Sequence, residues 1–137
     1  MNKKLLRGLL LIPAAVLLMA TTTLVDPPPV PVPPGLTEKE VHSALRRTLI
    51  QREWHIDQDK PREFVATLHV RVHSLTMRFV EDKGSIAINY VASENLDYEV
   101  KKNGTRIIHR KYPEWCANLA GAISRDLDLA LVEKSGS

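Results

Sequence analysis

The apolar residues that follow Leu36 recur every three or four positions, which predicts an amphipathic helix. Thr37 and Glu40 form a T-x-x-E capping box at its start. A second helical run surrounds Pro113, which is tolerated in a first turn because its missing N–H needs no partner there. The predicted buried faces are Val41, Ala44, Leu45, Thr48 and Leu49 in the first helix, and Tyr112, Trp115, Cys116, Leu119, Ile123 and Leu127 in the second.

Between Glu63 and Tyr90 the apolar period is two, which predicts three antiparallel strands. The apolar phase switches near His73, so we expect a tight hairpin or bulge over residues 71–74. Residues 81–84 (EDKG) predict a hairpin turn and residues 57–61 (DQDKP) a loop. Residues 101–104 (KKNG) predict a further turn, followed by a short extended piece over 105–109.

This order of elements predicts an α+β fold in which both helices cover one face of a small sheet. The expected domain, residues 36–132, consists of a helix, a three-stranded antiparallel sheet and a helix, an αβββα arrangement of two layers. Residues 133–137 are polar and predict a disordered tail.

Residues 1–25 have the form of an export signal. A basic start with Lys3, Lys4 and Arg7 precedes the apolar run 9–20, and residues 21–25 are small and weakly polar. No clean A-x-A cleavage site follows, so a cleaved signal peptide and a retained signal anchor both stay open. The leader is expected to form a signal or anchor helix, and an uncleaved helix over 8–25 is just long enough to span a bilayer. The predicted location is the periplasm, with the chain either anchored in the inner membrane or released after cleavage.

A proline-rich segment, residues 26–35, separates this leader from the predicted domain and holds six of the nine prolines. Successive prolines favour an extended polyproline II conformation, so we expect a linker that keeps the domain clear of the membrane. The alternative is a docking motif for a proline-binding partner. A spacer is useful only if the leader stays in the membrane, which favours the anchor.

The net charge of +3 equals the contribution of the three basic residues in the leader, and no acidic residue precedes Asp26. The rest of the chain carries equal numbers of basic and acidic side chains. This balance argues against a nucleic-acid-binding protein, which would need an excess of cations to neutralise phosphates.

Several motifs taken together resemble a family of small bacterial envelope proteins of unassigned function, many of them lipoproteins. The resemblance covers about Val41 to Leu127 and implies an αβββα domain in the envelope, without implying a reaction. Two departures are Pro113, where the family usually has Asn, and the absence of a lipid-accepting cysteine. The residues that carry the resemblance are Trp54, Arg71, His73, Tyr90, Ser93, Asn95, Leu96, Tyr98, Ile108, His109, Tyr112 and Trp115.

No arrangement in the sequence is typical of catalysis or metal binding. Ser93, Asp97 and His109 provide the atom types of a hydrolase triad, but no G-x-S-x-G motif surrounds the serine. On a continuous strand His69 and His73 would lie about 13 Å apart, too far to share a metal ion. The lone Cys116 lies on the apolar face of a helix and predicts a core residue. We therefore expect no catalytic residue, metal or cofactor.

The stretch Tyr90–Tyr98 gathers hydrogen-bonding side chains where a buried strand ends. The favoured interpretation is structural, because Ser and Asn side chains commonly replace lost backbone partners in such loops. The alternative is a shallow polar groove for an anionic or sugar ligand or for another envelope protein. Its predicted lining is Arg71, His73, Ser93, Asn95, His109 and Tyr112. The predicted function is a non-enzymatic binding or assembly module; a hydrolase of cell-wall material is the alternative. The sequence predicts no oligomeric state.

Overall fold

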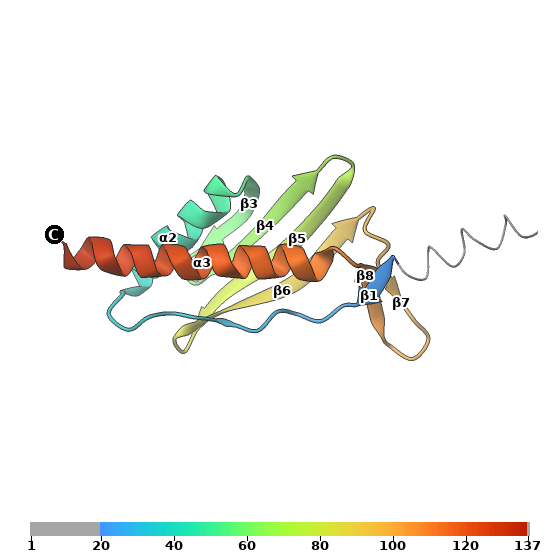
Figure 1. Ribbon diagram of the computed structural model, residues 1–137, viewed down its shortest axis with the longest axis horizontal. Helices are drawn as coiled ribbons and strands as arrows, with labels where there is room; N and C mark the ends of the chain where they lie inside the picture. The colour runs from blue at the N-terminus through green and yellow to red at the C-terminus, as the bar shows by residue number, and fades with distance from the viewer. Residues whose placement is uncertain (1–19, 137) are drawn as a thin grey trace, which may run out of the picture.

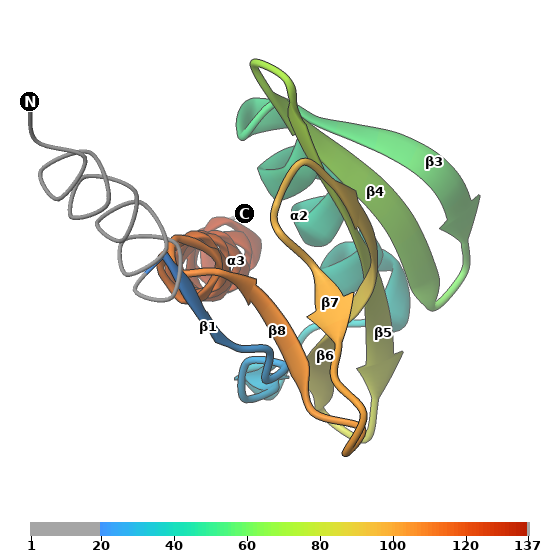
Figure 2. The same ribbon diagram turned by 90° about the vertical axis from the view of Figure 1, so that its right-hand side faces the viewer.

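The computed structural model describes residues 20–136. Its main layer is a five-stranded antiparallel sheet with the strand order β2-β6-β5-β4-β3. The strands are β2 (Val30–Pro31), β3 (Trp54–Lys60), β4 (Glu63–Val70), β5 (His73–Asp82) and β6 (Ser85–Glu94). Two helices, α2 (Glu38–Gln51) and α3 (Tyr112–Ser135), pack on one face of this sheet (Figures 1 and 2).

A second, smaller sheet lies at one end of the molecule (Figure 1). It has the strand order β1-β8-β7, and both pairings are antiparallel. Its strands are β1 (Thr21–Thr23), β7 (Glu99–Val100) and β8 (Arg106–His109). The helix α3 follows directly after β8, so this small sheet joins the start of the described chain to its last helix.

The predicted αβββα fold is wrong, because the structure holds one five-stranded and one three-stranded sheet beside its two helices. The leader helix expected within residues 1–25 lies mostly outside the described residues, and residues 21–23 form a strand. None of the helices within residues 20–136 is long and apolar enough to cross a membrane. The first helix and its capping box are confirmed, as are Pro113 at the start of α3 and the hairpin turn near residues 71–74.

The strand β3 replaces the loop predicted over residues 57–61. It is an edge strand, so most of its side chains stay exposed and only Trp54 is buried. A bulge at Asp57 breaks the alternation, since Ile56 pairs with Ala66 and Gln58 with Val65. A polar edge strand interrupted by a bulge lacks the period-two pattern, which explains why its sequence suggested a loop.

The proline-rich segment lies against the fold instead of extending away from it. Val30 pairs with Ile86 at the edge of the main sheet and is only 4% exposed. Prolines are tolerated at a sheet edge because a missing N–H there breaks no internal ladder. The Asp26 carboxylate accepts hydrogen bonds from the Tyr90 N–H at 2.9 Å and from Asn89 Nδ2 at 3.2 Å. The spacer predicted over residues 26–35 is therefore part of the domain edge.

The core lies between the main sheet and the two helices. The largest buried side chains of the sheet come from the inward face of β4, β5 and β6, and those of the helices from facing positions of α2 and α3. The helix α3 continues to Ser135 instead of fraying at residue 133, and Lys134 Nζ lies 2.8 Å from the Glu40 carboxylate of α2. The fully buried members include Phe64, Leu75, Met77, Phe79, Ile86, Ile88, Leu49, Ile123 and Leu127.

Candidate functional site

Hydrogen bonds of Asn95 and His73 join the β4–β5 turn to the end of β6. The Asn95 side-chain Nδ2 donates to the Val72 carbonyl at 2.6 Å, and His73 Nδ1 donates to the Asn95 carbonyl at 2.6 Å. Asn95 has φ +57°, a left-handed conformation that Asn adopts more readily than most residues. The two residues therefore fix the direction in which the chain leaves the sheet, toward the buried Leu96.

Ser93 and the two tyrosines that bracket the stretch form a second cluster. The Ser93 and Tyr90 hydroxyls share a hydrogen bond of 2.7 Å, and the rings of Tyr90 and Tyr98 stack with centroids 4.9 Å apart. Partial burial raises the pKa of Tyr90, an effect that outweighs the opposing hydrogen bond from Ser93. This cluster lies beside a bulge at Val91 that shifts the β5–β6 register, since Met77 pairs with Tyr90 and Thr76 with Ala92.

Tyr112 and Cys116 lie beneath this surface, in the core. Tyr112 is 1% exposed, and its hydroxyl points to Met77 Sδ at 3.9 Å. Burial raises the pKa of the Tyr112 phenol far above its ordinary range, and raises that of the Cys116 thiol from 9.0 to about 11. Both groups are therefore neutral at physiological pH, and Tyr112 has almost no surface with which to line a groove.

His109 and Arg71 occupy two other places in the fold. The His109 ring accepts a hydrogen bond from the Lys111 N–H at 3.1 Å, and its backbone N–H donates to the Leu96 carbonyl at 2.8 Å. Arg71 is exposed at the β4–β5 turn with φ +57°. Of the six residues predicted to line one groove, the structure thus brings His73 and Asn95 into direct contact through a hydrogen bond. Ser93 and His109 each have a different hydrogen-bond partner.

A small hollow that the sequence did not predict lies among α3, β3 and β4, with a volume of about 140 Å³. The strand pairing that places Trp54 opposite Leu68 creates one wall, and Trp115 and Leu119 of α3 form the other. Arg52 and Asn118 complete the lining. The sequence contains both tryptophans, but the polar pattern of β3 did not predict that this strand pairs with β4. That pairing places Trp54 at the hollow that Trp115 also lines.

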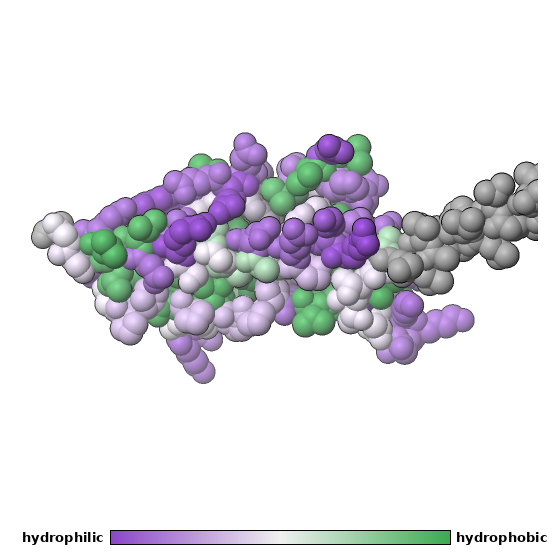
Figure 3. All heavy atoms as spheres, in the orientation of Figure 1, coloured by the Kyte–Doolittle hydropathy of each residue, from purple (hydrophilic) through white to green (hydrophobic). Residues whose placement is uncertain are grey.

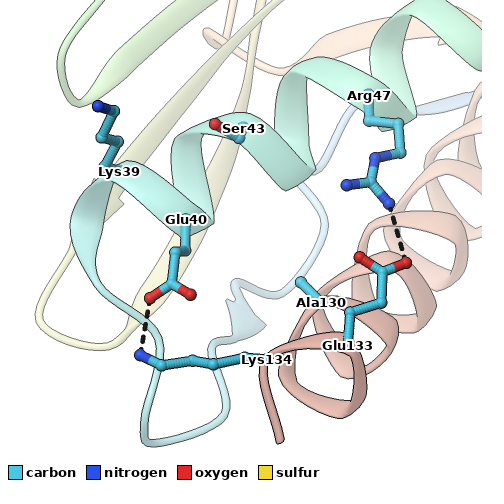
Figure 4. A pocket seen from close by; sticks show the side chains of 7 residues that line it. All are labelled: Lys39, Glu40, Ser43, Arg47, Ala130, Glu133 and Lys134. Atoms are coloured by element: carbon cyan, nitrogen blue, oxygen red, sulfur yellow. Dashed lines mark hydrogen bonds and ion pairs between the residues drawn. The ribbon is translucent and has the colours of Figure 1, made fainter. Parts of the chain in front are cut away.

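Two larger hollows flank α2 and are lined mainly by charged side chains. One, of about 450 Å³, lies between the helices and is bridged by the ion pairs Arg47–Glu133 and Lys134–Glu40 (Figure 4). Hydrogen bonding from Lys134, with that of the capping box, lowers the pKa of Glu40 from 4.5 to about 2. The ion pairs join the two helices at this hollow.

The other charged hollow, about 370 Å³, lies beside α2 next to the edge strand. There Asp59 of β3 lies 2.6 Å from both His42 Nε2 and Arg46. Partial burial pushes the pKa of Asp59 upward, but the hydrogen bonds from His42 and Arg46 outweigh it and lower the pKa overall. These contacts fasten α2 to the edge strand.

The surface that carries α3 is mostly polar, with its apolar side chains in small separate groups (Figure 3). Within residues 20–136, no three His, Cys, Asp or Glu side chains are grouped so as to hold a metal ion. Comparison of the chain with protein-family models, with curated proteins and with solved structures gave no match. The resemblance to small envelope proteins therefore stays a prediction from the motifs.

Proposed function

We propose that this chain is an exported envelope protein, held at the membrane by its N-terminal apolar segment, whose domain binds an apolar side chain of a protein partner. The hollow formed by Trp54 and Trp115 is the observation that carries this proposal. Its volume of about 140 Å³ would hold about five water molecules, which is less than a typical small-molecule site needs. One side chain of a partner protein fits it better.

The β4–β5 hairpin next to Leu68 supports the same interpretation. Val70 is 38% exposed and Val72 is 71% exposed, so apolar surface continues beyond the hollow along the hairpin. Apolar side chains beside a pocket with tryptophan walls are typical of the small number of residues that dominate protein-protein binding. The polar candidates support binding over catalysis as well, because Ser93 is bonded to Tyr90 and His109 to Lys111.

The path of residues 20–32 limits where the leader could be cleaved. Cleavage anywhere between residues 21 and 32 would remove parts of the fold, namely β1, the buried Leu24, the Asp26 carboxylate or the buried Val30. A cleaved protein would have to be cut at or before Ala20. Residues 26–35 do not act as a spacer, because Val30 pairs with β6 and Asp26 bonds the Tyr90 N–H.

Photo-crosslinking in the cell tests the binding proposal. A photoreactive amino acid at the exposed His69, on the hairpin strand, should give a discrete crosslinked product with an envelope protein. Val72→Asp should weaken this product about tenfold or more, because binding would bury an unpaired charge. Val132→Asp is the matched control, since Val132 is 66% exposed near the end of α3; it should leave the product unchanged.

Two results would contradict the proposal. One is a crosslinked product that is equally strong in the Val72→Asp and Val132→Asp variants. The other is release of soluble fragments from purified cell-wall material by the purified chain, abolished by Ser93→Ala or His109→Ala. The second result would favour the hydrolase.

A further inference from the structure

The first described residues belong to the small sheet, and no linker separates Ala20 from it. The Arg110 N–H donates to the Ala20 carbonyl at 2.9 Å, and Thr21 pairs with His109 in the β1–β8 ladder. The 19 residues before Ala20 therefore attach at the end of the molecule formed by β1, β7 and β8 (Figures 1 and 2). If they stay in a bilayer, this end of the domain must lie at the bilayer surface.

The same end of the domain carries a net positive charge. Residues 97–111 contain five Lys or Arg and two Asp or Glu, although the chain beyond residue 8 is neutral as a whole. The remainder of the chain beyond residue 8 therefore has an excess of three acidic side chains. We call the exposed cations of this region, Lys101, Lys102, Arg110 and Lys111, the basic end.

The β7–β8 turn holds two of these lysines on an ordered hairpin that projects from this end (Figure 1). The Lys101 N–H donates to the Thr105 carbonyl at 2.8 Å, and the Gly104 N–H donates to the Lys101 carbonyl at 2.9 Å. Gly104 has φ +86°, which a residue with a side chain rarely adopts. Beside the turn, Val100 is 56% exposed and Tyr98 is 39% exposed, so apolar side chains accompany the cations.

We propose that the basic end docks on the anionic phospholipid headgroups of the membrane that holds the N-terminal segment. Each Lys or Arg near an anionic surface contributes about 1 kcal/mol of attraction, and exposed Val and Tyr side chains can enter the interface. Some opposing charge is present, because Glu114 lies 3.4 Å from Lys111 and Glu99 lies on β7. The net charge of this end remains positive when these acidic side chains are counted. This proposal rests on the proposed membrane attachment and specifies which end of the domain faces the lipid.

Thiol labelling of the full chain in lipid nanodiscs tests the docking. Cys116 is 4% exposed and is the only native cysteine, so a new cysteine reports on its own site. Val100→Cys places a probe at the basic end without removing a cation. Val132→Cys is the matched control at the opposite end of α3, with a similar exposure of 66%. A membrane-impermeant maleimide is used with nanodiscs of phosphatidylcholine alone and with nanodiscs of equal parts phosphatidylcholine and phosphatidylglycerol.

We expect the Val100→Cys probe to label about tenfold more slowly in the anionic nanodiscs than in the neutral ones, and the Val132→Cys probe to label equally in both. Adding Lys101→Glu and Lys102→Glu, or raising the salt concentration, should restore fast labelling of the Val100→Cys probe. Equal labelling of this probe in both lipid compositions, whether fast or slow, would overturn headgroup docking and leave membrane attachment standing. Failure of the chain to enter nanodiscs at all would overturn both.

Discussion

At the residue scale, the polar stretch after β6 determines the path of the chain. Asn95 bonds the Val72 carbonyl with its side chain and receives His73 on its own carbonyl. The backbone partner of the Asn95 side chain belongs to the neighbouring β4–β5 hairpin. A local rule could identify Asn95 as a turn residue, but only the tertiary fold brings residue 72 to it.

Asn95 offers a test that separates its conformation from its hydrogen bond. Asn95→Gly and Asn95→Ala both lose the bond to Val72, but only Ala is strained at φ +57°. We expect the alanine variant to be less stable than the glycine variant by about 1 kcal/mol. Urea unfolding followed by tryptophan fluorescence measures this difference. Equal stability of the two variants would show that the left-handed conformation is not maintained.

Glu40 should make the fold sensitive to acid. Its pKa in the folded chain is lowered from 4.5 to about 2, so the ionised carboxylate stabilises the fold above pH 4.5 and this contribution is lost as the pH falls toward 2. Glu40→Gln keeps an oxygen to accept from the Thr37 N–H but cannot ionise. Its urea midpoint should therefore fall less between pH 4.5 and about 2 than that of the unmodified chain. Parallel pH profiles would argue against the Glu40–Lys134 pair.

At the element scale, the regular elements could be predicted from the sequence and the edge elements could not. The helix α2, its cap and the β4–β5–β6 meander follow strong periodic patterns, because each has one buried face. Edge strands have few buried positions. In β3 a bulge removes the alternation, and β2 contains a proline, so neither strand carries a readable pattern. The Trp54–Trp115 hollow depends on β3 and was missed with it.

The proline-rich segment should detach from the sheet when its side-chain anchor is removed. Asp26→Ala leaves the Tyr90 N–H without the acceptor it has at 2.9 Å, which should cost about 1–3 kcal/mol. Asp26→Asn retains an acceptor oxygen and should cost less. Hydrogen exchange measures the effect directly, and the amide of Tyr90 and those of residues 24–32 should exchange faster in the alanine variant. Unchanged exchange there would mean that the segment is held by other contacts.

At the scale of the whole molecule, the basic end and the Trp54–Trp115 hollow are formed by different residues. The basic end lies beside the point where the N-terminal segment joins the fold. The hollow lies among α3, β3 and β4, and the exposed Val70 and Val72 follow its lining residue Leu68 along the chain. Headgroup docking rests on the proposed membrane attachment, whereas partner binding at the hollow can fail while the docking stands.

The central claim is that the chain keeps its N-terminal segment and stays at the membrane. Fractionation of cells that produce the chain, followed by intact mass measurement, tests it most directly. We predict a membrane-bound protein with the full mass of 15.4 kDa. A soluble periplasmic protein whose first residue is Thr21 or a later residue would contradict the account.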